Sequence, residues 1–184
     1  NYEKNLKIIV LPFGEKVKSF KFLEKILEKA LSFKIDRNIF LFAIGGGVIG
    51  DLAGLASSLL LRGINLIQVP TSLLAQVDSS VGGKTGINSK YGKNLIGTFK
   101  QPKSVIISID FLKTLKKREI ISGYAEILKY SLIRDQKFFI WLLKNGNSIL
   151  NLDEQSCLYA ISKSCNIKAK IVSQDENEKG IREI

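Results

Sequence analysis

An apolar run that ends in glycines, "FLFAIGGGVIGDLAGLASSLLLRG" over residues 40–63, constrains the fold more than any other stretch of the chain. A continuous apolar run bounded by glycines is typical of a strand buried on both faces of a parallel sheet. The spacing of Gly45, Gly47 and Gly50 matches the dinucleotide fingerprint, which also requires an acidic residue about 20 positions downstream. The next apolar run, "NLIQVP", contains no acid. The loop alone therefore leaves two readings open, a phosphate-binding turn and a tight turn without a ligand.

Strand and helix patterns alternate over the first 110 residues. We expect strands over residues 6–11, 38–44, 65–69 and 104–109, and a polar, glycine-rich loop from Asp78 to Gly97. Helices are expected over residues 15–33, 48–61 and 72–77; in the first of them the spacing places one apolar stripe, formed by Val17, Phe20, Leu23, Ile26, Leu27 and Ala30. This alternation predicts an α/β fold with a Rossmann-like nucleotide-binding layer.

After residue 110 the patterns are helical, with no strand between them. We therefore expect two domains, a nucleotide-binding α/β domain over residues 1–110 and the start of an all-α metal- and substrate-binding domain over residues 111–184. The sequence contains no methionine and no histidine. We expect a fragment that lacks the beginning of the first domain and the end of the second.

The net charge of +11 comes from lysines spread along the chain. Because these lysines form no basic arm and no aromatic-interleaved motif, we expect no nucleic-acid partner. No apolar run approaches the roughly 20 residues that span a bilayer, so no membrane partner is expected either. Without a signal peptide, and with Cys157 and Cys165 too far apart along a helix for a disulfide, a cytoplasmic location is predicted.

Two polar segments are candidates for chemistry. The first, residues 78–97, holds Asp78, Lys84, Lys93 and Asn94 among glycines, the residue types used by phosphate sites. The second, "ISGYAEILKYSLI", places Glu126 and the lysine at position 129 on one face of a helix that is apolar on nearly every side. A buried pair would form a shared polar pocket, with the carboxylate as a possible metal ligand; an ordinary surface ion pair is the alternative.

At these segments the sequence resembles the 3-dehydroquinate synthase family of the sugar phosphate cyclase superfamily. The matching stretches are "GGGVIGDLAG", "IQVPTSLLAQVDSSVGGKTGIN", "GKNLIGTF", "SGYAEILKY" and "KAKIVSQDENEKGIRE", in the family's order and spacing. The upstream "PFGEKVKS" resembles a further family element, although Phe13 replaces an acid often found there. Together these stretches cover almost the whole chain.

The resemblance implies an NAD-dependent lyase of the shikimate pathway that also uses a divalent metal, zinc or cobalt. Its substrate would be a phosphorylated sugar acid, 3-deoxy-D-arabino-heptulosonate 7-phosphate. The family oxidises a ring hydroxyl transiently with NAD, eliminates phosphate and reduces the ketone again. Ring opening and aldol closure then give 3-dehydroquinate.

The resemblance also assigns residues by position. Those implied for the cofactor are Phe13, Gly14, Glu15, Lys16, Val17, Lys18, Gly47, Val48, Ile49, Gly50, Asp51, Thr71, Ser72, Lys84, Lys93, Phe111, Leu112, Lys113 and Thr114. Those implied for catalysis and the substrate are Asp78, Lys84, Asn94, Lys129, Lys168, Arg182 and Arg62. Arg62 matches an arginine that reaches a neighbouring subunit, which implies a homodimer, and Glu126 matches a metal ligand.

The family's two histidine metal ligands have no counterpart in this sequence, which contains no histidine. We therefore expect these 184 residues by themselves to be inactive. Three alternatives remain open: a sister sugar phosphate cyclase, a related metal-dependent polyol dehydrogenase, and a non-catalytic remnant that keeps the fold.

Overall fold

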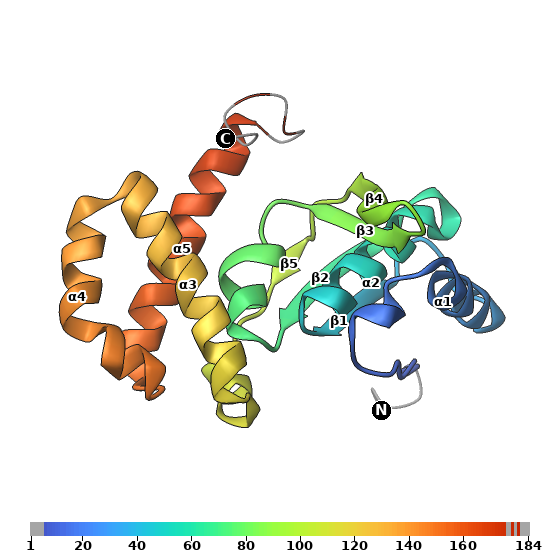
Figure 1. Ribbon diagram of the computed structural model, residues 1–184. Helices are drawn as coiled ribbons and strands as arrows, with labels where there is room; N and C mark the ends of the chain where they lie inside the picture. Colours follow the sequence, from blue (N-terminus) through green and yellow to red (C-terminus); the bar gives the residue numbers. More distant parts are fainter. Residues whose placement is uncertain (1–5, 176–177, 179, 181–184) are drawn as a thin grey trace.

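A small parallel sheet with flanking helices is followed by a group of long helices (Figure 1). The computed structural model describes residues 6–175, 178 and 180. In chain order its elements are η2 (Glu15–Val17), α1 (Phe20–Ser32), β1 (Phe40–Gly45), α2 (Gly47–Leu59), η3 (Leu60–Arg62), β2 (Asn65–Pro70), η4 (Ala75–Ser79), β3 (Lys84–Ser89), β4 (Gly92–Phe99), β5 (Ser104–Val105), η5 (Ile109–Thr114), α3 (Lys117–Arg134), α4 (Gln136–Leu150) and α5 (Glu154–Gln174). The predicted α/β class is confirmed by the parallel sheet and by the structural relatives described below.

The sheet has the strand order β1-β2-β5, and both pairings are parallel. β1 pairs with β2 from Phe40 opposite Asn65 to Gly45 opposite Pro70, so the two strands end side by side. α2 follows β1 directly and packs on the sheet, where Ala43, Ala53 and Leu66 form a buried cluster. The carboxyl ends of β1 and β2 consequently open on the same edge of the sheet, next to the start of α2.

β1 is not buried on both faces, so that expectation was wrong. Phe40, Phe42 and Ile44 are 53%, 51% and 59% exposed, whereas Ala43 between the last two is buried. Alternate residues of a strand point to opposite faces of a sheet. In the described part of the chain only the α2 side of this strand is covered.

The expected strand over residues 6–11 is also absent from the described structure. Leu6, Ile8 and Val10 are largely exposed, while Ile9 and Leu11 pack against a core cluster that contains Val17 and other residues of η2, α1 and α2. Apolar alternation gives a strand only when a neighbouring strand can satisfy its backbone groups. Similarly, only Ser104–Val105 of the run 104–109 forms a strand, β5.

The helix expected over residues 15–33 is interrupted. It consists of the short 3-10 turn η2 and of α1, with the extended residue Ser19 between them as the N-cap of α1. Phe20, at the first position of α1, is 59% exposed and does not belong to the buried stripe. The interruption has a consequence for the site, because it turns Lys18 toward the interior, where only 5% of the residue is exposed.

The expected loop over residues 78–97 is largely an antiparallel hairpin, β3–β4. The strands pair from Lys84 opposite Phe99 to Ser89 opposite Gly92, with a register shift between Ile87 and Ser89. Gly97 allows the close approach of the two backbones, because a Cβ there would lie 1.9 Å from the carbonyl oxygen of Thr85. The glycines that predicted a loop are thus partly a packing requirement of a narrow hairpin.

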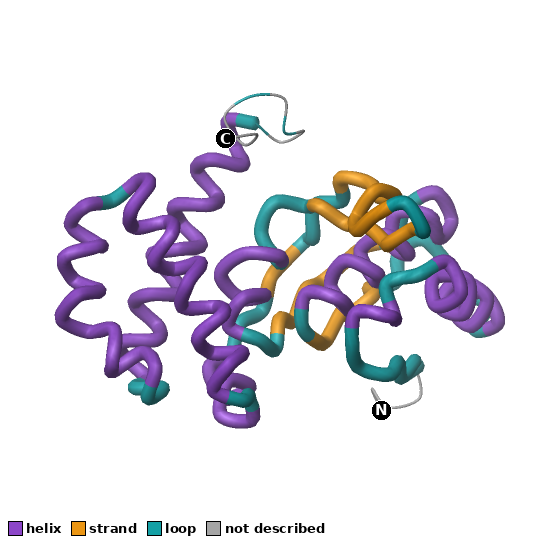
Figure 2. Tube along the Cα trace, in the orientation of Figure 1, coloured by secondary structure: helices purple, strands orange, loops and turns teal. Residues whose placement is uncertain are grey.

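The three long helices and the segment around η4 share one core. Its buried members are Leu73, Val77, Leu112, Ile120, Ile127, Phe138, Leu142, Ile149, Cys157, Ala160 and Ile161. Figure 2 shows α3, α4 and α5 gathered at one end of the molecule, while the strands lie toward the other end together with α1 and α2. A domain boundary near residue 110 stays a prediction. Within the described residues, no helix combines the length and the apolar character needed to cross a membrane.

Candidate functional site

A glycine turn connects β1 to α2 at the edge where β1 and β2 end. Gly46 is the N-cap of α2, and the backbone N–H of Thr71 donates to the carbonyl of Gly45 at 2.9 Å, tying the two strand ends together. A Cβ on Gly47 would lie 2.9 Å from the Oγ of Ser79, so a side chain at position 47 would require Ser79 to move. The turn therefore leaves the N–H groups at the start of a 13-residue helix next to Ser72 and Ser79, the geometry that binds phosphate.

Lys18, Asp51 and Asn94 come together although they lie in three separate segments. Lys18 Nζ donates to Asp51 Oδ2 at 2.6 Å and also to Asn94 Oδ1. Burial raises the pKa of Asp51 above its ordinary value, and the ion pair with Lys18 offsets part of that rise. Lys18 thus joins Asp51, which like Lys18 was predicted to contact the cofactor, to Asn94, which was predicted to face the substrate.

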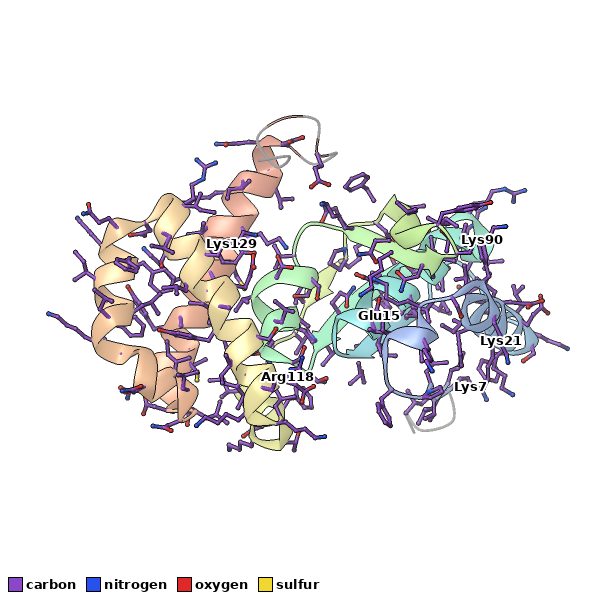
Figure 3. All side chains as sticks on the ribbon, viewed as in Figure 1. Lys7, Glu15, Lys21, Lys90, Arg118 and Lys129 are labelled. Carbon is purple, nitrogen blue, oxygen red and sulfur yellow. The ribbon has the colours of Figure 1, made fainter. Side chains whose placement is uncertain are left out.

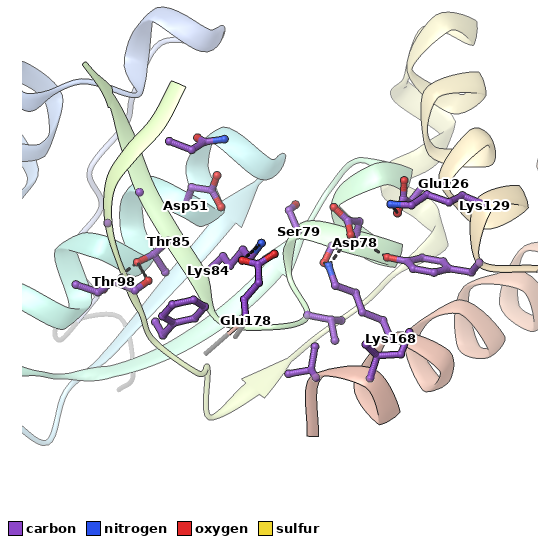
Figure 4. Close-up of a pocket in the computed structure, with 18 of the residues that line it drawn as sticks. Asp51, Asp78, Ser79, Lys84, Thr85, Thr98, Glu126, Lys129, Lys168 and Glu178 are labelled. Carbon is purple, nitrogen blue, oxygen red and sulfur yellow. Dashed lines mark hydrogen bonds and ion pairs between the residues drawn. The ribbon is translucent and has the colours of Figure 1, made fainter. Parts of the chain in front are cut away.

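A cavity of about 910 Å³ lies between the hairpin β3–β4 and the helices α3 and α5 (Figure 4). Its lining includes seven predicted site residues: Asp51, Asp78, Lys84, Asn94, Glu126, Lys129 and Lys168. In the close-up, Asp51, Lys84 and Thr85 project from the sheet side and Glu126, Lys129 and Lys168 from the helices, with Asp78 between them. One cavity therefore gathers residues that are up to 117 positions apart in the sequence, from Asp51 to Lys168.

Asp78 is the most highly connected of these residues. Lys168 Nζ donates both to its Oδ1 and to its backbone carbonyl, and the hydroxyl of Tyr130 donates to Oδ1 at 2.8 Å. Burial alone would raise the pKa of Asp78, but Lys168 and Tyr130 outweigh it and hold that pKa below its ordinary value. Asp78 is therefore a carboxylate at neutral pH.

Tyr130 is a cavity residue that the sequence interpretation missed. Burial raises the pKa of its hydroxyl far above the ordinary value, and the carboxylates of Asp78 and Glu126 raise it further. The hydroxyl is accordingly a neutral donor at physiological pH. The sequence analysis did not single out Tyr130; the available signal was its spacing of four residues from Glu126, which places both on one face of α3.

Glu126 and Lys129 form an ion pair of 3.0 Å on α3, at the wall of the cavity. The prediction that this helix is buried on nearly every side was wrong: the side chain of Lys129 is 58% exposed, and Ile121 and Leu132 on other faces are also exposed. A metal site needs several ligands, and the described residues contain no cluster of three or more His, Cys, Asp or Glu. Glu126 alone does not form a metal site.

The remaining predicted residues that the structure describes do not line the main cavity. Glu15 and Lys16 line a second cavity of about 480 Å³ together with Lys18 and Asn88. Figure 3 shows Glu15 on the sheet side of the molecule, whereas Lys129 lies on α3 among the helices. Phe13 and Lys93 are exposed; Val17 belongs to the core.

Further candidate residues lie at the end of η3, in η5 and on the wall of the main cavity. Arg62 is an exposed residue at the end of η3 with a positive φ of 63°. In η5, formed by residues 109–114, Leu112 is buried in the helical core, and Lys113 pairs with Asp110 at 2.6 Å. Lys84, on the cavity wall, pairs with Glu178. Arg182 lies outside the described residues.

Solved structures with this architecture are sugar phosphate cyclases and metal-dependent alcohol dehydrogenases. The chain is similar to 2-epi-5-epi-valiolone synthase from Streptomyces hygroscopicus, solved with NAD+ and Zn2+ bound, at 28% identity and a TM-score of 0.88 over 92% of this chain and 48% of that one. It is similar to a 2-deoxy-scyllo-inosose synthase solved with carbaglucose-6-phosphate, NAD+ and Co2+, at 31% identity and a TM-score of 0.85, covering 92% of this chain and 46% of that chain. An iron-containing alcohol dehydrogenase from Thermotoga maritima, at 14% identity and a TM-score of 0.67 over 94% of this chain and 55% of that one, shares the fold.

Sequence comparison narrows this class to one family. Family models described as 3-dehydroquinate synthase N-terminal and C-terminal match residues 8–122 and 123–184, and the chain belongs to the 3-dehydroquinate synthase family. It is 52% identical to the chloroplastic 3-dehydroquinate synthase of Arabidopsis thaliana over 95% of this chain and 39% of that protein, and 50% identical to the enzyme of Rhodospirillum rubrum over 95% of this chain and 45% of that protein. The predicted family is thereby confirmed. The chain spans less than half the length of these relatives.

Proposed function

We propose that the complete protein is a 3-dehydroquinate synthase of the shikimate pathway, a lyase that converts 3-deoxy-D-arabino-heptulosonate 7-phosphate to 3-dehydroquinate and phosphate. The observation that carries the proposal is the 50–52% identity to proteins of this name over 95% of the chain. The polar cavity supports it, because lysine, aspartate and asparagine side chains surround a space large enough for a phosphorylated sugar acid.

The glycine turn fits NAD, which would supply reversible hydride transfer. Gly47 lies so close to Ser79 that a Cβ would displace the Ser79 side chain, and the N-terminus of α2 directs its N–H groups to where a pyrophosphate would bind. We propose that Gly47, Thr71 and Ser72 hold the pyrophosphate region and that Asp51 contacts the sugar next to it. Glu15 would contact the adenosine ribose, a role usually given to an acid after the second strand.

The chemistry of the cavity suits a substrate with two anionic groups. Lys84 and Asn94 on the hairpin would bind the phosphate, because an ammonium and an amide both donate to phosphate oxygens. On the opposite wall, Lys129 and Lys168 would hold the carboxylate and the ring hydroxyls. Asp78, kept ionised by Lys168, would orient a substrate hydroxyl by accepting a hydrogen bond from it.

Three parts of the proposal go beyond the 184 residues. Glu126 would be one oxygen ligand of a divalent metal, with further ligands supplied from outside this sequence. Arg62, exposed and remote from the main cavity, would reach the substrate phosphate of a second subunit in a homodimer. A cytoplasmic location is the third part of the proposal.

A sister cyclase is the second candidate. It is favoured by the two solved cyclases, which superpose with TM-scores of 0.88 and 0.85 and are named for other carbocyclic products. Their identities of 28% and 31% are lower than those of the dehydroquinate synthases. Substrate choice separates the two candidates.

The test is an assay of the complete protein with the heptulosonate phosphate, NAD and zinc or cobalt. We expect release of phosphate with no net accumulation of NADH, because the hydride returns to the product. Accumulating NADH would identify a dehydrogenase instead. Turnover of glucose 6-phosphate, whose carba analogue is bound in one of the solved cyclases, in place of the heptulosonate phosphate would identify a sister cyclase.

A further inference from the structure

Asn88 connects the two segments that the proposed function assigns to the cofactor and to the substrate. It lies at the register shift of the hairpin, between Ile87 and Ser89. Its backbone N–H donates to the carbonyl of Lys18 at 2.9 Å, and its side-chain Nδ2 donates to Glu15 Oε1 at 2.7 Å. Its Oδ1 accepts from the backbone N–H of Asn94 at 2.9 Å.

The bond to Asn94 supports an unusual backbone conformation. Asn94 has a φ of 57°, in the left-handed region that residues other than glycine seldom adopt. The N–H of such a residue needs an acceptor that fixes its direction, and Asn88 Oδ1 supplies it. In this conformation Asn94 Oδ1 accepts from Lys18, which is in turn paired with Asp51.

The chemistry of the partners requires an amide at position 88. A carboxylate at Glu15 needs a donor, and a backbone N–H at Asn94 needs an acceptor. Asparagine offers both on one short side chain. Aspartate keeps the acceptor but loses the donor, and alanine loses both.

We propose that Asn88 is a positioning residue that holds Asn94 toward the substrate and Glu15 toward the nucleotide in a fixed relation. This inference rests on the proposed function for the roles of its two partners. Asn88 does not line the main cavity, so it acts through Glu15 and Asn94 and not by touching the reacting atoms.

A double-mutant cycle tests the Glu15 side of this arrangement. Asn88→Asp places two carboxylates face to face, and we expect it to weaken NAD binding about tenfold, measured by titration calorimetry of the complete protein. When Glu15→Gln is combined with Asn88→Asp, the amide introduced at position 15 can donate to the carboxylate introduced at position 88. In that background Asn88→Asp should therefore change the NAD dissociation constant less than about twofold. Equal effects in both backgrounds, or a protein that binds no NAD, would overturn the Glu15 link.

Hydrogen exchange at the Asn94 amide tests the other side and needs no ligand. Asn88→Ala should speed this exchange about tenfold, whereas Asn88→Asp, which keeps the acceptor, should leave it near that of the parent protein. The KM for the heptulosonate phosphate should rise in Asn88→Ala more than kcat falls. Unchanged exchange in Asn88→Ala would overturn the inference.

Asn65→Ala is the matched control, because its side-chain amide donates to the carbonyl of Ile39 at 3.2 Å on the far side of the sheet. It should cost stability without moving the NAD constant, the KM or the exchange at Asn94. If Asn65→Ala moved them equally, the effect would be a general loss of stability and the inference would fail. A complete protein that binds NAD but releases no phosphate would contradict the proposed function, while both binding and exchange would still decide the role of Asn88.

Discussion

The polar side chains of the cavity are held in pairs and small networks, and the networks around Asp51 and Asp78 each contain one buried donor. For Asp78 that donor is the hydroxyl of Tyr130, which shares Oδ1 with Lys168. Since two donors meet on this one oxygen, Oδ2 is the oxygen of Asp78 that remains for a ligand. In the described structure Asp78 thus presents Oδ2 to the cavity in a fixed orientation. Tyr130, which helps to fix it, lies in a helix whose sequence is largely apolar.

Replacing Tyr130 by phenylalanine removes this donor and keeps the ring. A hydrogen bond to a charged acceptor contributes about 1.5–3 kcal/mol, so we expect the free energy of unfolding at pH 7 to fall by about 1.5 kcal/mol. Because the folded pKa of Asp78 lies below its unfolded value, the stability it contributes is present above the unfolded pKa and is lost as the pH falls through the folded pKa. The difference between the two proteins should therefore shrink at pH 3.

Urea unfolding at pH 7 and pH 3 measures both quantities. Tyr91→Phe is the control, because Tyr91 is 80% exposed and its hydroxyl makes no hydrogen bond within the described residues. A loss of stability in Tyr130→Phe that is the same at both pH values would show that the hydroxyl does not act through the ionised carboxylate of Asp78.

At the scale of elements, the hairpin β3–β4 decides how the cavity is built, because it carries Lys84 and Asn94. Its two strands approach closely at Gly97 and are joined by Thr85, whose hydroxyl donates to the carbonyl of Thr98 at 2.8 Å. The hydroxyl of Thr98 donates in turn to Ser58 on α2 at 3.0 Å. The hairpin is thereby fixed to the helix that begins at the glycine turn.

Gly97→Val should separate the two strands of the hairpin. A Cβ at this position meets the backbone carbonyl of Thr85, which cannot move without shifting β3. We expect a loss of about 2–4 kcal/mol in the free energy of unfolding and faster amide exchange in the hairpin. Gly92→Ala is the matched control, because its nearest neighbour at 3.0 Å is the flexible end of the exposed Leu95 side chain. Equal effects of the two substitutions would contradict the packing role of Gly97.

For the whole molecule, the sequence predicted the parallel α/β layer, the helical part after residue 110 and the family. It did not predict the hairpin, because the glycines and polar residues at 78–97 look like a loop until the pairing partner is known. It also did not predict the interruption at Lys18 or the exposed face of β1, since both depend on which segments lie alongside. Five of the seven candidate residues of the main cavity came from the two polar segments, and the resemblance added Asp51 and Lys168. Tyr130 and Asn88, which bond to residues of this set and to Glu15, were found from the distances in the structure.

The last prediction concerns the connection between the sheet and the helices. Leu73, which follows β2, is fully buried in the helical core, and its side chain lies where a Cβ on Gly123 of α3 would come within 2.6 Å. Because this contact joins the two parts of the molecule, Leu73→Ala should lower the stability of both together, by about 2–5 kcal/mol. Trp141, the one tryptophan of the chain, reports on the helices, and amide exchange in β2 reports on the sheet. The urea concentrations at which the Trp141 signal and the β2 amide exchange change should fall by the same amount.

Leu60→Ala is the control for this experiment. Leu60 is equally apolar and buried, but it packs with Ala30 and Ile64 in a cluster at the far side of the sheet. Leu60→Ala should destabilise β2 at least as much as the helices, whereas Leu73→Ala should destabilise both parts equally. If Leu73→Ala moved the Trp141 transition and left β2 unchanged, the two parts would unfold independently, and the cavity between them would depend on a bound ligand for its shape. Coincident transitions would instead show that the shared core alone holds the walls of the cavity together.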